Sequence, residues 1–186
     1  MSAPLSAPPP ATLAVLRAVA AGTAGRSGAD FFHSLIENLS LATRVPNAFI
    51  AEFAGQTTRV RTLAFWKDGG FIANEEWDLA GTPCEQVVAG RLLHVPANVW
   101  REFPDDPGSR DVESYLGVPL RDATGAVLSH LAIFDSKPMP ADPGLEAIFS
   151  IFAARAAAEL DRLRTQARLF ESEERYRDLF DESPIA

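Results

Sequence analysis

The segment VLSHLAIFD (127–135) constrains the fold most strongly, because it predicts a β-strand that is apolar on both faces. Residues i and i+2 of a strand point to the same side. The two expected faces consist of Val127, Leu131 and Ile133 on one side and Leu128, Ala132 and Phe134 on the other. A strand buried on both sides lies in the middle of a sheet that helices or loops cover. The chain must therefore supply further strands and covering layers on both faces.

Further strands are predicted in five segments, namely 47–53, 60–66, 71–79, 91–95 and 117–120. Asp68-Gly69-Gly70 indicates a hairpin between the second and third of these, because glycine adopts positive φ without steric cost. With the segment 127–135, the chain has about six strands. Helical patterns precede and follow them. We therefore expect an α+β fold with a central antiparallel sheet and with the N- and C-terminal helices packed on one face.

Three helices are predicted around these strands. The first covers 31–43, where apolar residues recur at helical spacing after a possible cap at Asp30. A short second helix follows Thr82-Pro83, which places a cap and a first-turn proline in succession. The third begins at Pro143 and continues to about Phe180. Its length of roughly 55 Å exceeds what a compact domain needs.

The composition narrows the possible partners. With 186 residues and 47% hydrophobic content, the chain has room for one ordinary domain and flanking arms. A net charge of −8 argues against nucleic acid and against an anionic membrane surface as partners. No run of 18 apolar residues is present, so no membrane insertion is expected. Cys84 is the only cysteine, which excludes an intrachain disulfide. We expect a cytoplasmic protein.

The chain divides into three parts. Residues 1–27 begin with a proline-rich stretch and predict a flexible arm with a short helix over 12–22. Residues 28–165 hold the predicted sheet and its covering helices. Residues 166–186 continue the long helix and end in SPIA, which we interpret as a linker into a further domain.

The long helix carries an apolar stripe with alternating steps of four and three residues, which is typical of a coiled-coil seam. Its members are Phe149, Ala153, Ala156, Leu160, Leu163, Ala167 and Phe170. The next two seam positions are Glu174 and Arg177, so the stripe ends there. The stripe favours a homodimer. The alternative is a single amphipathic helix that packs on its own domain.

The order of these elements and several motifs resemble a known family. The motifs are GADFFHSLIENLSLATRVPNAFIAEF, TPCEQVVAGRLLHVP, FPDDP and ESYLGVPLRDATGAVLSHLAIFD. They are similar to GAF domains at the input end of bacterial sensor kinases and cyclases, over about residues 28–165. The closing stretch SEERYRDLFDESPIA resembles the opening of a PAS domain. The resemblance implies a sensory domain in a longer signalling protein, whose output domain could be a histidine kinase or a cyclase.

The sequence gives no indication of catalysis or of a metal site. G-x-S-x-G, G-x-G-x-x-G, H-E-x-x-H and Walker patterns are all missing. The histidines His33, His94 and His130 are isolated from one another, and buried or hydrogen-bonded histidines are more common than haem ligands. Bilin and cyclic-nucleotide signatures are absent as well. The cofactor, if one exists, therefore stays unknown.

The resemblance implies a small-molecule pocket between the sheet and the segments that follow the third strand. The residues expected there are Trp66, Trp77, Cys84, Val87, His94, Trp100, Phe103 and Tyr115. Apolar walls with a few polar tips suit a small ligand. The alternative is that these side chains simply fill a core.

Two features of this region stay open. The start of a helix could lower the pKa of Cys84, or the residue could be a small buried hydrophobe. The loop 104–113 could be a lid over the pocket or a solvated surface.

Together these features predict a sensory module. It would bind a small molecule and relay the signal through a dimeric C-terminal helix to a PAS domain. The alternative is a GAF-type dimerisation scaffold without a ligand.

Overall fold

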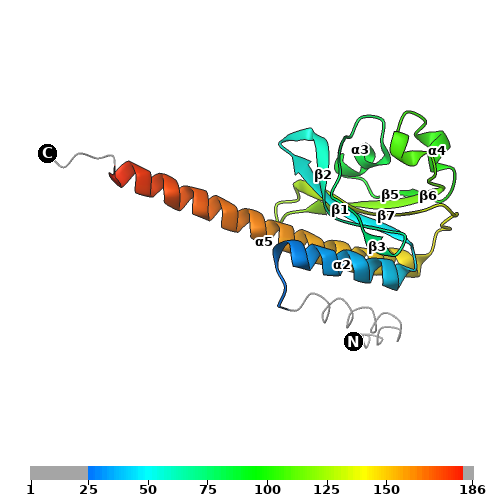
Figure 1. The fold of residues 1–186 in the computed structure, drawn as a ribbon, viewed down its shortest axis with the longest axis horizontal. Coiled ribbons are helices and arrows are strands. Elements are labelled where there is room, and N and C mark those ends of the chain that lie inside the picture. The colour runs from blue at the N-terminus through cyan, green and yellow to red at the C-terminus, as the bar shows by residue number, and fades with distance from the viewer. Residues whose placement is uncertain (1–24, 182–186) are drawn as a thin grey trace, which may run out of the picture.

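The computed structural model describes residues 25–181, with side chains through Arg177. The helix predicted over 12–22 and the PAS-like ending SPIA lie outside the described residues. Within this range one antiparallel sheet separates two helical layers (Figure 1). The α+β fold expected from the sequence is confirmed.

The sheet contains seven strands in the order β3-β2-β1-β7-β6-β5, with β4 paired to β2 beside this path. Every pairing is antiparallel. The strands are β1 (Asn47–Ala54), β2 (Gln56–Lys67), β3 (Gly70–Phe71), β4 (Glu76–Asp78), β5 (Leu93–Val95), β6 (Ser114–Arg121) and β7 (Val127–Asp135). The predicted strand over 71–79 is two short strands, both paired to β2, which explains the difference from the six expected.

A tight hairpin joins β2 to β3 at the predicted position. Lys67 pairs with Gly70, so Asp68 and Gly69 form the two-residue loop. Both have positive φ, 48° and 90°. Two consecutive positive φ values characterise the turn that matches the twist of a β-hairpin.

Two long helices cover one face of the sheet and form the larger core with it (Figure 1). They are α2 (Gly28–Thr43) and α5 (Pro143–Asp181). The opposite face is covered by shorter elements, namely α3 (Pro83–Val88), α4 (Val99–Glu102) and the 3₁₀-helix η1 (Pro107–Ser109). None of the helices in the described range is long and apolar enough to cross a membrane.

The helix boundaries follow local chemistry. The Thr82 side chain accepts a hydrogen bond from the Glu85 N–H, and Pro83 occupies the first turn of α3, as predicted. The Asp142 carboxylate accepts from the Gly144 N–H at 2.8 Å and so caps α5. The expected cap at Asp30 is wrong: α2 begins at Gly28, three residues before the predicted start, which places Asp30 in its first turn.

Strand β7 is central and almost entirely buried, as its two apolar faces predicted. The position of Leu128 differs from the prediction. Arg121 pairs with Val127 and Leu120 pairs with Ser129, so Leu128 is skipped in the register. This bulge turns Leu128 into the core shared with α2 and α5, on the same side as Leu131 and Ile133.

Most of the predicted dimer seam packs inside its own domain. Phe149, Ala153, Ala156 and Leu160 belong to the core between α5 and the sheet, and Leu163 packs at its edge. The interpretation of these five residues as a free seam is corrected, because the sheet and α2 already cover them. Only the last two seam residues, Ala167 and Phe170, are exposed.

A buried carboxylate of α5 accepts a hydrogen bond from the start of α2 and forms an ion pair within its own helix. Glu159 is 8% exposed and accepts a hydrogen bond from the Gly28 N–H at 3.1 Å. Both oxygens of the same carboxylate accept from Arg162, at 2.6 and 2.8 Å. These donors hold the pKa of Glu159 below its usual value, with Arg162 as the largest cause.

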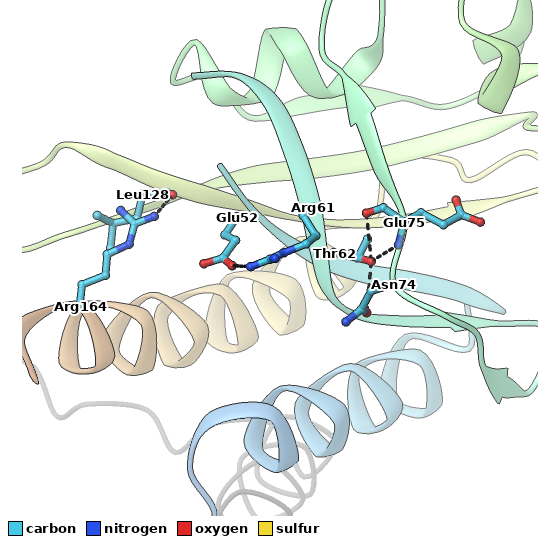
Figure 2. Close-up of polar contacts among 7 residues, drawn as sticks. All are labelled: Glu52, Arg61, Thr62, Asn74, Glu75, Leu128 and Arg164. Atoms are coloured by element: carbon cyan, nitrogen blue, oxygen red, sulfur yellow. Dashed lines mark hydrogen bonds and ion pairs between the residues drawn. The ribbon is translucent and has the colours of Figure 1, made fainter. Parts of the chain in front are cut away.

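The part of α5 beyond Arg164 leaves the globule. Arg164 donates to the Leu128 carbonyl at 2.8 Å, at the beginning of β7 (Figure 2). Residues 165–177 are all exposed, and α5 runs well past the sheet (Figure 1). The exposed large apolar side chains of this α5 extension are Leu169, Phe170 and Tyr176.

Candidate functional site

A cavity of about 290 Å³ lies on the face of the sheet opposite α2 and α5. This volume is close to the lower limit of ordinary ligand sites. Strands β1, β2, β6 and β7 form its floor, and α3, α4, η1 and β4 surround it. Its lining residues are Phe49, Phe65, Glu75, Glu76, Trp77, Pro83, Cys84, Val99, Asp106, Pro107, Gly108, Ser109, Val112, Tyr115 and Phe134.

Aromatic rings form one wall of the cavity. The Phe49 ring lies at the centre of the group, with its centroid 5.5 Å from those of Phe65 and Trp77 and 6.2 Å from that of Phe134. Phe49, Phe65 and Phe134 come from three neighbouring strands, whose alternation points all of them away from the helices. The wall therefore follows from strand geometry alone.

A buried thiol from α3 and a buried phenol from β6 also line the cavity. Cys84 Sγ lies 3.6 Å from Tyr115 Oη, and the two residues are 5% and 3% exposed. Burial raises the pKa of Cys84 to about 12, and the Asp106 carboxylate acts in the same direction. Burial also raises the pKa of Tyr115 well above its usual value. Both groups are neutral near pH 7, so the thiol is not an activated nucleophile.

A glycine makes room for the Tyr115 ring. A Cβ atom at Gly117 would lie 2.6 Å from Tyr115 Oη and 2.8 Å from a Val87 methyl carbon. The two residues are neighbours on one face of β6, and α3 packs over both. The absence of a side chain at Gly117 therefore sets the position of the phenol beside the cavity.

Three acidic residues line the cavity, namely Glu75, Glu76 and Asp106. Asp106 caps η1: its Oδ1 accepts from the Gly108 N–H at 2.9 Å, and its Oδ2 accepts from Ser109 Oγ at 2.5 Å. Glu76 forms an ion pair with Arg59 at 3.2 Å. These contacts fix two of the three carboxylates in place.

The backbone of Glu75 is locked to β2 by Thr62. The Thr62 N–H donates to the Glu75 carbonyl at 2.9 Å, and the Glu75 N–H donates to Thr62 Oγ1 at 2.8 Å. Thr62 Oγ1 also donates to Asn74 Oδ1 at 3.2 Å. Figure 2 shows the Glu75 carboxylate pointing away from Thr62. The acidic group therefore sits on a rigid support.

The structure brings three of the eight predicted pocket residues to the cavity wall. Trp77, Cys84 and Tyr115 line it. Val87 and Phe103 are buried in the core behind it. Trp100 is 41% exposed, and it lines a separate hollow with Arg101, Phe103, Pro104, Asp106 and Arg110.

Two predicted pocket residues lie on the other side of the sheet. Trp66 packs against the core shared with α2 and α5, because alternation along β2 reverses its direction relative to Phe65. His94 pairs with Leu116, which faces the same helices, and its Nε2 lies 2.9 Å from the Met139 carbonyl oxygen. Their assignment to the pocket is corrected.

The loop 104–113 contributes five lining residues, from Asp106 to Ser109 and Val112. The loop is therefore not a purely solvated surface, as one of its two interpretations held. The sequence analysis did not identify Phe49, Phe65 and Phe134 as lining residues. Each of them alternates along its strand with residues that face α2 and α5, and this alternation could have identified them.

A buried histidine lies beneath the same layer. His130 is 0% exposed, and neither ring nitrogen has a hydrogen-bond partner within the described part of the chain. Its ring contacts Phe49 edge to face, with centroids 5.3 Å apart. Burial lowers the pKa of His130 to about 3, so the imidazole is neutral. Among residues 25–181, no group of three or more potential metal ligands comes together.

No protein-family model and no curated protein sequence matches the chain. Solved structures do match it. The GAF domain of a phosphoenolpyruvate-protein phosphotransferase from Acinetobacter has a TM-score of 0.69 at 14% identity, covering 87% of this chain and 99% of that one. The corresponding GAF domain from Coxiella burnetii has a TM-score of 0.68 at 16% identity, covering 86% and 99%.

A bacteriophytochrome from the photosynthetic bacterium R. palustris has a TM-score of 0.67 at 9% identity. This match covers 96% of the present chain and 42% of the bacteriophytochrome. At such identities the likeness concerns the fold. The chain therefore has the fold of GAF domains, as its motifs predicted.

Proposed function

We propose that this chain is a sensory module that binds a small molecule in the cavity and relays its presence through α5. The observation that carries the proposal is that the same strands line the cavity and support α5. In β6, Tyr115 lines the cavity while Leu116 packs toward the helices. In β7, Phe134 lines the cavity while Ile133 packs toward the helices. A ligand that shifts these strands therefore also shifts the surface on which α5 rests.

The α5 extension provides the output of this module. Its exposed Leu169, Phe170 and Tyr176 are 59–64% accessible. We infer that a second copy of the chain covers them, so that two extensions pair in a homodimer. The PAS-like ending would then receive the movement and pass it to an output domain. For such a relay the ligand must bind the two helix arrangements with different affinities.

The chain itself would carry out no catalysis in this scheme. Its one cavity thiol is protonated near pH 7 and so is a weak nucleophile. The work of the module would be binding and transmission.

Mass spectrometry of the protein purified from cells tests the binding step. We expect the native mass to exceed the denatured mass by that of a small molecule. Trp77→Ala removes part of the aromatic wall and should abolish this extra mass, while Trp100→Ala, outside the cavity, should retain it.

The alternative is a scaffold without a ligand. Equal native and denatured masses would contradict the proposal and support the scaffold, provided that a panel of metabolites also leaves the melting temperature unchanged.

A further inference from the structure

We propose that the ligand is an organic cation, namely an ammonium group attached to an apolar body. This inference rests on the proposed function and specifies the chemical class of the molecule in the cavity. It follows from three properties of the site: aromatic rings in its wall, acidic residues in its lining, and the lack of a positively charged side chain among the described lining residues.

The aromatic wall suits a cation. The ring centroids of Phe65, Trp77 and Phe134 lie 5.5, 5.5 and 6.2 Å from that of Phe49. The face of an aromatic ring attracts a cation electrostatically, most strongly for tryptophan and in sites shielded from water. The same rings would pack against the apolar body of the ligand.

The charges around the cavity favour the same ligand class. Glu75 and Asp106 contribute two carboxylates without an ion pair in the described residues, whereas that of Glu76 is paired with Arg59 and none of the described lining residues is lysine, arginine or histidine. The Glu75 carboxylate forms no ion pair within residues 25–177 and points away from its Thr62 support (Figure 2). An anionic ligand would meet repulsion here without any compensating side chain.

The arginines around the cavity do not neutralise its negative charge. Arg59 pairs with Glu76 and Asp78 outside the cavity, at 3.2 and 3.4 Å. Arg101 and Arg110 line the separate hollow on the other side of Asp106, and neither forms an ion pair with it in the described part of the chain. The Asp106 charge reaches the cavity floor, since it helps to raise the pKa of both Cys84 and Tyr115.

Titration calorimetry at physiological salt with probes that differ only in charge tests the inference. The first set is 2-phenylethylammonium, 2-phenylethanol and phenylacetate. The second is choline, 3,3-dimethylbutanol and 3,3-dimethylbutyrate. We expect the cation of at least one set to bind about tenfold or more tightly than its neutral analogue, and the carboxylate to bind weakest.

Charge-removing variants locate the effect. Glu75→Gln and Asp106→Asn should each reduce the preference for the cation several-fold, with unfolding followed to verify that the domain stays intact. Asp105→Asn is the matched control, because Asp105 is exposed, lies next to Asp106 and does not line the cavity. It removes the same charge and should leave the preference unchanged.

The outcomes separate this inference from the proposed function. Tighter binding of the neutral or anionic probe overturns the cation assignment and leaves a small-molecule sensor standing. An equal loss of preference in Asp105→Asn also overturns it, because the attraction would then come from the net charge. If no probe binds, the cation assignment fails, and the mass comparison above decides on the sensor by itself.

Discussion

Single buried side chains determine the chemistry of the cavity lining. Cys84 lies in the first turn of α3, where a helix N-terminus favours a thiolate. The residue is nevertheless 5% exposed, and burial raises its pKa to about 12. Desolvation therefore outweighs the helix dipole, and the residue behaves as a small buried hydrophobe.

We predict that Cys84 resists thiol reagents in the native protein. Its pKa rises from 9.0 to about 12, so the thiolate fraction at pH 8 falls by roughly a thousandfold. Labelling with a chromogenic disulfide should be slower by about this factor than in urea. Because the chain has one cysteine, the signal is unambiguous. Equal rates in the native and unfolded states would contradict the buried floor.

His130 predicts how stability depends on pH. Burial lowers the pKa of the folded state to about 3 from 6.5, so the unfolded chain takes up the proton first. The contribution of the neutral imidazole is complete above pH 6.5 and is lost as the pH falls toward 3. At pH 5 the loss amounts to about 2 kcal/mol of unfolding free energy.

The His130→Leu variant should flatten this dependence between pH 5 and 7 in urea unfolding experiments. It should also be at least as stable as the original protein at pH 7, because two unpartnered nitrogens disappear. His33→Gln, at a histidine outside both buried cores, is the control that keeps the original slope. An unchanged slope in His130→Leu would show that His130 is not the group responsible.

At the scale of elements, α5 combines a buried half and an exposed half. Leu160 is 3% exposed in the core, whereas Leu169 and Phe170 are 59% and 61% exposed on the extension. The Arg164 bond to the Leu128 carbonyl marks the change between the two halves. The same apolar spacing therefore has two roles along one helix.

Paired substitutions distinguish these roles. Leu160→Glu with Leu163→Glu places charge in the core and should unfold the domain, which circular dichroism would record. Leu169→Glu with Phe170→Glu should keep the melting temperature within a few degrees and yield a monomer by light scattering. A dimer mass in this second variant would contradict pairing through the extension, and a folded first variant would contradict the packing of α5.

The sequence predicted the elements well where local signals were strong. The hairpin at Asp68-Gly69, the Thr82 cap and the limits of β7 agree with the structure. The errors concerned which face of the sheet a residue lies on. Trp66 and His94 lie on the helix side, and Leu128 lies at a bulge, because register and alternation are set by pairing partners distant in sequence.

The candidate site was predicted in part for the same reason. Trp77, Cys84 and Tyr115 were identified because they belong to the region in which the family resemblance places a pocket. The phenylalanines of β1, β2 and β7 were missed because such residues are typical of any core strand. The seam on α5 looked continuous, since heptad spacing does not show which residues the sheet already covers. Only the tertiary arrangement reveals that Leu160 is inside and Phe170 is outside.

On the scale of the whole molecule, the central claim is that the sheet couples its two faces. One face holds the cavity, the other supports α5, and adjacent residues of β1, β6 and β7 belong to opposite sides. Because both layers pack against one set of strands, the proposed relay would carry a change in the cavity to α5 without a hinge between domains.

Amide hydrogen exchange with and without the tightest-binding probe of the charge series tests this claim most directly. We predict slower exchange in the cavity segment 104–113 and, in the same sample, altered exchange in α5 over residues 145–164. Exchange that changes only on the cavity side, with α5 identical in the two states, would contradict coupling through the sheet.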